Sequence, residues 1–157
     1  TEVQTRDGRT LDAVVVAFDP ERDLALLHVD DLEAPGLERA DGGIGDTGAV
    51  YGHPGGGALR AAPARIAEVV TAGGTDIYRT GRTDRSVFVL AAELAPGDSG
   101  GPLVDRQGRV VGVAFAVDPG APGTAYALTR QELDAVLQPA LAAGSELAVE
   151  TGPCLVG

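Results

Sequence analysis

An all-β fold, a sandwich or a barrel with one helix near its C-terminal end, is the fold class that this sequence predicts. Short runs rich in β-branched residues alternate with turn-forming Gly, Pro and Asp along most of the chain. Near the end, one stretch repeats apolar residues at helical spacing instead. Many short strands punctuated by Gly and Pro are typical of β-sandwiches and β-barrels.

Two groups of strands are expected, separated by residues 31–46. The first group is Val3–Arg6, Thr10–Phe18 and Leu24–Val29. Asp7-Gly8 is a hairpin signal between the first two strands, and Asp19-Pro20 ends the second. The second group is Thr47–Gly52, Ala64–Thr71, Ser86–Ala92, Pro102–Asp105, Val110–Ala116 and Thr124–Leu128. The acidic segment between the groups contains Gly and Pro, which is typical of a linker.

One helix is expected after the last strand. Thr129 and Glu132 have the spacing of a capping box, in which each side chain bonds the other residue's backbone N–H. Apolar residues follow at helical spacing, at Leu133, Val136, Leu137, Ala140 and Leu141. Gly144 is expected to end the helix, and the leucine face is expected to pack on the β-structure.

Composition and charge exclude several classes of function. The 157 residues carry 23 acidic and 12 basic side chains, for a formal net charge of −11. A chain this negative is not expected to bind nucleic acid or a membrane surface, since both need clustered Lys and Arg. The sequence contains no run of about 20 apolar residues, which is the length that a membrane-spanning helix needs. No His or Cys cluster has metal-ligand spacing, so we expect no metal and no other cofactor.

The run Pro96-Gly97-Asp98-Ser99-Gly100-Gly101-Pro102-Leu103-Val104 is the most specific pattern in the sequence. A nucleophilic Ser needs an exposed position on a tight turn, with two backbone N–H groups converging where the oxyanion forms. Gly residues permit positive φ there and leave room for a substrate. The alternative is a Gly-rich turn with an incidental Ser, which the Gly-Pro-Leu-Val continuation and the following hairpin disfavour.

This motif resembles the nucleophile loop of the chymotrypsin/trypsin fold, a pair of six-stranded barrels with the catalytic site in the cleft between them. Further matching segments are Asp23-Leu24-Ala25-Leu26-Leu27, Tyr51-Gly52-His53-Pro54-Gly55-Gly56 and Pro122-Gly123-Thr124-Ala125-Tyr126. Within the family, the chain is most similar to the actinobacterial membrane-anchored periplasmic serine proteases of the MarP type. It resembles the HtrA-like proteases more loosely.

The resemblance implies a chymotrypsin-like double β-barrel whose first barrel is incomplete, plus a C-terminal helix. Residues 1–30 would be the remnant of the N-terminal barrel, and 31–46 the inter-barrel linker. Residues 47–143 would form the C-terminal barrel with its helix, and 144–157 a tail. Unpaired strand edges in half a barrel are expected to make the chain dimerise or swap strands.

The resemblance also implies roles for single residues. Ser99 would be the nucleophile, and its own N–H and that of Gly97 would form the oxyanion hole. Asp23 would orient the catalytic His. Glu93 would lie at the base of the primary specificity pocket, with a water-facing Glu on a strand edge as the equal alternative. The segment resembling the strand that pairs with the substrate backbone is Ala114, Phe115 and Ala116. The partner of Asp98 is not identified by the sequence.

The catalytic His is missing from this pattern. The family order is His, Asp, Ser, and no His precedes Asp23. His28 is expected on a solvent-facing strand position and His53 in a Gly-rich turn, so neither is expected to be the general base. With the short first strand group and the absence of Met, this predicts an N-terminally truncated fragment that is inactive as given. Cys154 would be an inert thiol or the partner of an upstream Cys.

We therefore expect the protease domain of a trypsin-like serine endopeptidase that acts on peptides or proteins. The alternative is a peptide-binding pseudoprotease that retains the fold without the chemistry. An α/β-hydrolase is disfavoured, because that fold needs a helix directly after the nucleophile and a His later in the chain. An extracytoplasmic location, with a membrane anchor upstream, is implied by the resemblance alone.

Overall fold

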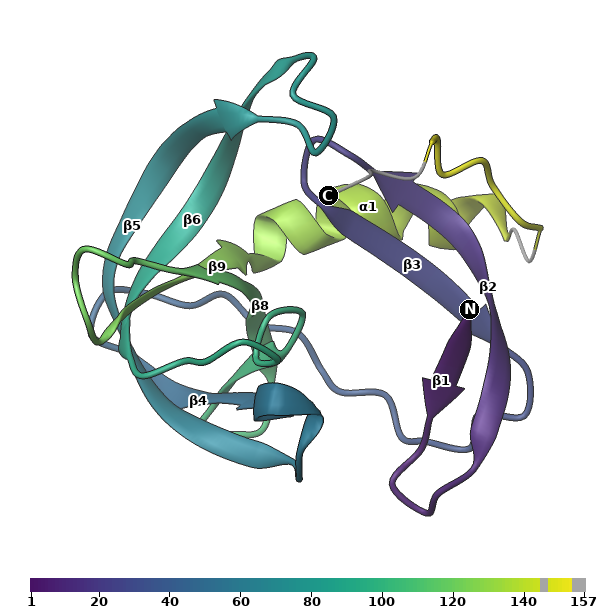
Figure 1. The fold of residues 1–157 in the computed structure, drawn as a ribbon, viewed down its shortest axis with the longest axis horizontal. Coiled ribbons are helices and arrows are strands. Elements are labelled where there is room, and N and C mark those ends of the chain that lie inside the picture. The colour runs from purple at the N-terminus through teal and green to yellow at the C-terminus, as the bar shows by residue number, and fades with distance from the viewer. Residues whose placement is uncertain (145–146, 154–157) are drawn as a thin grey trace. The chain divides into compact units, whose positions relative to one another are not determined.

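All of the predicted strands and the predicted helix are present in the computed structural model, which describes residues 1–144 and 147–153 (Figure 1). The strands are β1 (Glu2–Gln4), β2 (Thr10–Asp19), β3 (Leu24–Val29), β4 (Thr47–Gly52), β5 (Arg60–Thr75), β6 (Arg82–Ala92), β7 (Pro102–Asp105), β8 (Val110–Val117) and β9 (Thr124–Thr129). A short 3-10 helix, η1 (Pro54–Gly56), follows β4, and α1 (Arg130–Ala143) follows β9. Cys154 lies outside the described residues.

The chain divides into two compact units. The first comprises Thr1–Pro35, Gly73–Thr83 and the described residues from Asp134 onward. The second comprises Gly36–Ala72 and Asp84–Leu133. The second unit contains the whole nucleophile motif, so the geometry of that motif can be built within one unit.

The first unit is built on the antiparallel sheet β1-β2-β3. Asp7-Gly8 lies in the turn between β1 and β2, as the hairpin signal predicts, and Gly8 adopts a φ of +85°. At the other end of β2, the Asp19 carboxylate accepts the N–H groups of Glu21 and Arg22 at 2.9 and 3.0 Å. This local bonding shapes the turn that leads to Asp23 at the start of β3.

The second unit is a closed barrel in the order β4-β5-β6-β9-β8-β7. Alternate residues point inward, so β5 buries Ala62, Ala64 and Ile66 and exposes the residues between them. The core of buried side chains is Val50, Ala64, Ile66, Phe88, Leu90, Ala92, Leu103, Val111, Ala114, Ala125 and Ala127. This packed barrel is the support from which the loop between β6 and β7 projects.

Two strands are longer than the sequence predicts. β5 begins at Arg60 rather than at Ala64, and β6 begins at Arg82 rather than at Ser86. Pro63 disfavours a strand because it cannot donate to the ladder, yet it pairs with Ala49 inside the β4–β5 register. The extension places Arg60 directly opposite Gly52.

The start of α1 corrects the predicted capping box. The helix begins at Arg130 as expected, but the Thr129 hydroxyl is buried without a hydrogen-bond partner among the described residues. Glu132 instead accepts the N–H of Ser86 on β6 at 2.7 Å. The Thr129 half of the predicted capping box is therefore absent, and Glu132 has a tertiary partner that the sequence did not predict. Leu133 is buried whereas Leu141 is 61% exposed, so only the first half of the predicted leucine face is covered.

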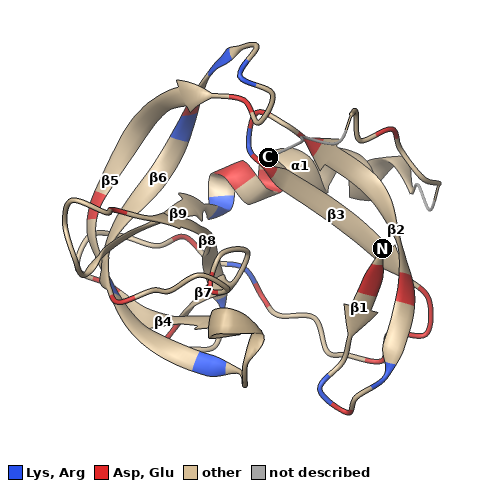
Figure 2. Cartoon of the chain, viewed as in Figure 1, with Lys and Arg blue, Asp and Glu red and all other residues tan. Residues whose placement is uncertain are grey.

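Acidic residues are distributed over strands, loops and α1 (Figure 2). Some of the ion pairs that they form join neighbours in sequence, such as Arg9–Asp7, Arg22–Asp19 and Arg109–Asp105. Arg60–Asp98 and Arg130–Asp41 join distant residues, and they differ in burial, because the side chain of Asp98 is 1% exposed and that of Asp41 is 81% exposed. Within the described residues, no helix is long and apolar enough to cross a bilayer.

Candidate active site

The loop between β6 and β7 carries Ser99 on a tight turn. Gly97 and Gly100 on either side adopt φ values of +101° and +82°, which L side chains rarely reach. Ser99 itself is exposed, and its hydroxyl donates to the carbonyl of Phe115 at 3.3 Å. The Gly residues of the motif thus permit a backbone path that presents the hydroxyl at the surface.

Within residues 95–101 of this loop, two backbone N–H groups have no hydrogen-bond acceptor among the described residues. They are those of Gly97 and Ser99, whereas Asp98 between them donates its N–H to the carbonyl of Ala95 at 2.9 Å. Both residues are exposed, so these two donors are accessible to an acceptor from solvent. Two such donors beside a nucleophilic Ser are what stabilisation of a developing oxyanion requires.

The turn at residues 53–56 holds the nucleophile loop through two backbone hydrogen bonds. His53 donates its N–H to the carbonyl of Gly97 at 3.0 Å, and Gly55 donates to the carbonyl of Pro96 at 2.8 Å. The carbonyl of Pro96 and the N–H of Gly97 belong to one peptide group. In the described chain this group is trans, so its C=O and N–H point in opposite directions. Because the carbonyl points toward the turn, the N–H of Gly97 points away from it, which leaves it available to a substrate.

Replacing Gly97 by alanine should abolish this arrangement. The new Cβ would lie 2.3 Å from the carbonyl oxygen of His53, at a backbone φ that alanine resists. Loss of one oxyanion donor costs about 10²–10³ in kcat, and we expect that loss for peptide hydrolysis by the complete gene product. The matched control is Gly108→Ala, because Gly108 has a φ of +83° with nothing within 4 Å. Equal kcat values for the two variants would contradict this prediction.

Asp98 is the buried carboxylate of the loop. Its Oδ2 accepts the N–H of Ala95 at 2.9 Å and the Arg60 guanidinium at 2.7 Å. The Ala95 N–H, followed by Arg60, holds the pKa of Asp98 below its ordinary value although burial opposes this. The charged form therefore holds the loop at neutral pH, and its contribution is lost only as the pH falls through that lowered pKa.

Ala114–Ala116 on β8 lie beside the nucleophile loop. Ala114 accepts the N–H of Gly100 at 2.8 Å and donates its own N–H to Gly101 at 2.9 Å. The pairing of β8 with β7 ends at Val113, and beyond Ala114 its ladder continues only with β9. Phe115 falls at a bulge in that ladder, with the Arg85 guanidinium 5.5 Å from its ring centroid.

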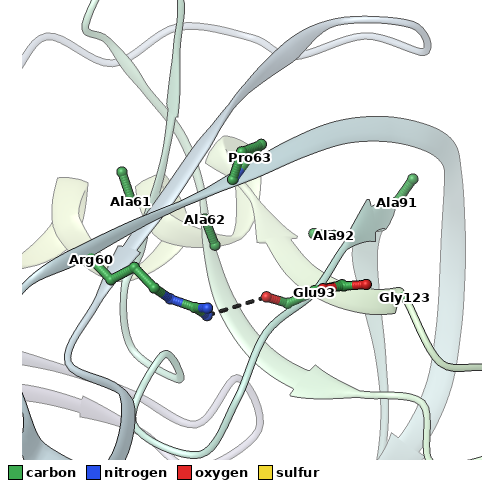
Figure 3. A pocket seen from close by; sticks show the side chains of 8 residues that line it. All are labelled: Arg60, Ala61, Ala62, Pro63, Ala91, Ala92, Glu93 and Gly123. Carbon is green, nitrogen blue, oxygen red and sulfur yellow. Dashed lines mark hydrogen bonds between the residues drawn. The ribbon is translucent and has the colours of Figure 1, made fainter.

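Glu93 lies at the edge of a surface cavity of about 470 Å³ (Figure 3). Its walls come from residues 60–63 of β5, residues 91–93 and Gly123. The carbonyl of Glu93 accepts a hydrogen bond from Arg60 at 3.2 Å, while the side chain extends toward Gly123. Ser99 and Ala114–Ala116 are not among the residues that line this cavity.

Asp23 belongs to the first unit, whereas the other candidate residues belong to the second. It is exposed at the start of β3 and adopts a φ of +56°. Asp is among the few side chains that tolerate this left-handed conformation.

The two histidines have different surroundings. His28 on β3 lies in the first unit, with its Nε2 3.1 Å from the Asp30 carboxylate. His53 lies in the second unit, with its Nδ1 2.9 Å from the carbonyl of Gly57. The backbone of His53, rather than its ring, contacts the nucleophile loop.

An exposed Ser beside two N–H groups that have no acceptor among the described residues is the arrangement that a serine hydrolase requires. The sequence pattern described as a trypsin-like peptidase domain matches residues 1–113. The chain therefore belongs to the trypsin-like peptidase family, and the expected family resemblance is confirmed.

Individual relatives agree with this assignment. The chain is 38% identical over 151 residues to serine protease Rv3671c of Mycobacterium tuberculosis, which covers 94% of this chain and 37% of that protein. It is 32% identical over 140 residues to the periplasmic serine endoprotease DegP of Salmonella typhimurium, covering 81% and 27%. The chain thus spans less than two fifths of the length of either relative.

A solved structure extends the match to the fold. The active form of the Rv3671c protease superposes with a TM-score of 0.91 at 37% identity, covering 99% of this chain and 68% of that one. The chymotrypsin-like fold predicted from the motifs is confirmed.

The sequence missed Arg60 as a residue of the nucleophile loop. Nothing near Asp98 in the chain signals a basic partner, because Arg60 lies on a strand 38 residues away. Arg60 lies opposite Gly52 because of the register of β4 and β5, which only the structure shows.

Proposed function

We propose that this chain contributes the nucleophile, the oxyanion hole and the triad Asp of a serine endopeptidase. One observation carries the proposal. The N–H groups of Gly97 and Ser99 have no hydrogen-bond acceptor among the described residues, and they lie beside the exposed Ser99 hydroxyl. Membership of the trypsin-like peptidase family supports the same chemistry.

In this mechanism, the Ser99 oxygen attacks the carbonyl carbon of the scissile bond while a general base removes its proton. The carbonyl oxygen becomes an oxyanion and accepts the N–H groups of Gly97 and Ser99. The C–N bond then breaks, the amine leaves with the proton from the base, and an acyl-enzyme remains on Ser99. Water hydrolyses that ester by the same steps. Asp23 orients the base and stabilises its protonated form.

The substrate backbone would pair with Ala114–Ala116, in a β-augmentation mode. The end of the β7 ladder at Val113 supports this, since it leaves one side of β8 without a strand partner beyond Ala114. Glu93 would favour a substrate with a basic side chain before the scissile bond. Its cavity has no wall from Ala114–Ala116, so a role in specificity would require the side chain to turn away from Gly123.

Neither His28 nor His53 stands before Asp23, as the family order His, Asp, Ser requires, so another residue would have to act as the general base. We therefore propose that this chain alone is inactive. An extracytoplasmic location is supported by the similarity to DegP of Salmonella typhimurium, a periplasmic protease. The substrate would be a peptide or protein.

The alternative is a peptide-binding pseudoprotease, which retains the fold without the chemistry. A fluorophosphonate probe separates the two functions, because it bonds only to an activated Ser. This chain and the complete gene product are treated side by side, with Ser99→Ala as the control. Labelling of the complete product alone, lost in Ser99→Ala, is expected. Labelling of neither form would favour the pseudoprotease.

A further inference from the structure

The residue between the two proposed oxyanion donors, Asp98, is held by a side chain from a distant strand, Arg60 of β5. Asp98 lies between Gly97 and Ser99, so the orientation of its side chain and those of the two flanking peptide groups are linked. Its carboxylate is 1% exposed, and a charge so buried needs a compensating partner. Arg60 is the charged group that contacts it, at 2.7 Å.

Arg60 contacts the loop at two points. Its Nη2 donates to the Asp98 carboxylate and, at 3.2 Å, to the carbonyl of Glu93. Figure 3 shows the guanidinium extending from β5 to that carbonyl. One side chain of the rigid barrel thus fixes both the start of the loop and the residue beside the nucleophile.

The β4–β5 pair is shaped to receive Asp98. Gly52 is the cross-strand partner of Arg60. A Cβ on Gly52 would lie 2.4 Å from the Asp98 Oδ1 and 2.7 Å from its Cα. Gly52 therefore supplies the space and Arg60 the charge, at adjacent positions of the same strand pair.

We propose that Arg60 is a positioning residue, which acts through Asp98 to hold the N–H groups of Gly97 and Ser99 in the arrangement that binds the oxyanion. The inference rests on the proposed function. Without Arg60, the Asp98 charge would be buried with a single donor, the Ala95 N–H. The peptide group that follows Asp98 carries the Ser99 N–H. A backbone movement that brought the Asp98 carboxylate to water would turn this donor, which would then no longer converge with the Gly97 N–H.

The test compares Arg60→Gln with Arg109→Gln in the complete gene product. Arg109 is a matched control, since it is 42% exposed against 44% for Arg60 and also contacts an Asp at 2.7 Å. Its partner, Asp105, lies outside the nucleophile loop. For Arg60→Gln we expect kcat for peptide hydrolysis to fall by about 10- to 100-fold with KM nearly unchanged, because oxyanion donors act in the transition state.

Arg60→Lys retains the charge and should recover part of the lost kcat. Arg109→Gln should match the wild type. Equal kcat values for Arg60→Gln and Arg109→Gln would overturn the proposal, and so would a loss confined to KM.

A second measurement does not depend on activity. Amide hydrogen exchange of this chain should be faster across residues 94–101 in Arg60→Gln, and unchanged in the β-strands of the barrel, which also verifies that the variant folds. Unchanged exchange in that loop would overturn the positioning role. If the wild-type complete product hydrolyses no peptide, the proposed function fails, while the exchange result still decides whether Arg60 holds the loop.

Discussion

Replacing Ser99 by alanine in the complete gene product should lower kcat for peptide hydrolysis by about 10⁶, because the members of a triad act as a unit. Alanine removes the only atom that can form the acyl-enzyme. The fold should be unaffected, since the exposed Ser99 hydroxyl makes one long hydrogen bond, of 3.3 Å, to Phe115. Cleavage of a fluorogenic peptide measures the loss, and the unfolding midpoint in urea verifies the fold.

Ser86→Ala is the matched control for this experiment. Ser86 lies on β6 in the same unit, and its backbone N–H, rather than its hydroxyl, makes the contact with Glu132. Its replacement should leave turnover unchanged. Residual hydrolysis close to the wild-type rate in Ser99→Ala would refute the acyl-enzyme mechanism. Peptide binding that survives in both variants, without turnover in the wild type, would identify a pseudoprotease.

Replacing Asp23 by asparagine should lower kcat by about 10⁴, because an amide leaves the catalytic His in the wrong tautomer. Asparagine tolerates the φ of +56° at this position, so the turn before β3 should form normally. Stopped assays at high enzyme concentration would measure the residual rate, and labelling by the fluorophosphonate probe should slow in parallel.

Asp12→Asn controls for the loss of one negative charge from the first unit. Asp12 is also exposed, on β2 in the same sheet. Its replacement should leave kcat unchanged. If Asp23→Asn behaves like Asp12→Asn, another group orients the base and the proposed role of Asp23 is wrong.

The elements that the sequence predicted are those in which local pattern and tertiary structure agree. Alternation along β5 buries Ala62, Ala64 and Ile66, and the Asp7-Gly8 hairpin forms where its chemistry places it. At the start of α1 the two disagree, because the Thr129 hydroxyl has no partner among the described residues while Glu132 accepts the N–H of Ser86 on a distant strand. A pattern of neighbours in sequence cannot reveal such a tertiary contact.

In the candidate site too, local features were predictable and long-range contacts were not. Ser99 and Gly97 were predicted because a turn motif is local and its backbone conformation requires Gly residues. The carboxylate of Asp98 was visible in the motif, but its partner was not, since Arg60 reaches it through the cross-strand pairing with Gly52. Long-range ion pairs depend on register, which a single sequence leaves open.

The turn at residues 53–56 fastens the nucleophile loop with main-chain atoms alone, through the N–H groups of His53 and Gly55. Gly55 and Gly56 adopt φ values of +62° and +73°, so glycine is strongly favoured at both positions. The imidazole of His53 takes no part in that fastening. Position 53 is therefore a site where the side chain could be varied while the anchoring of the nucleophile loop stays intact.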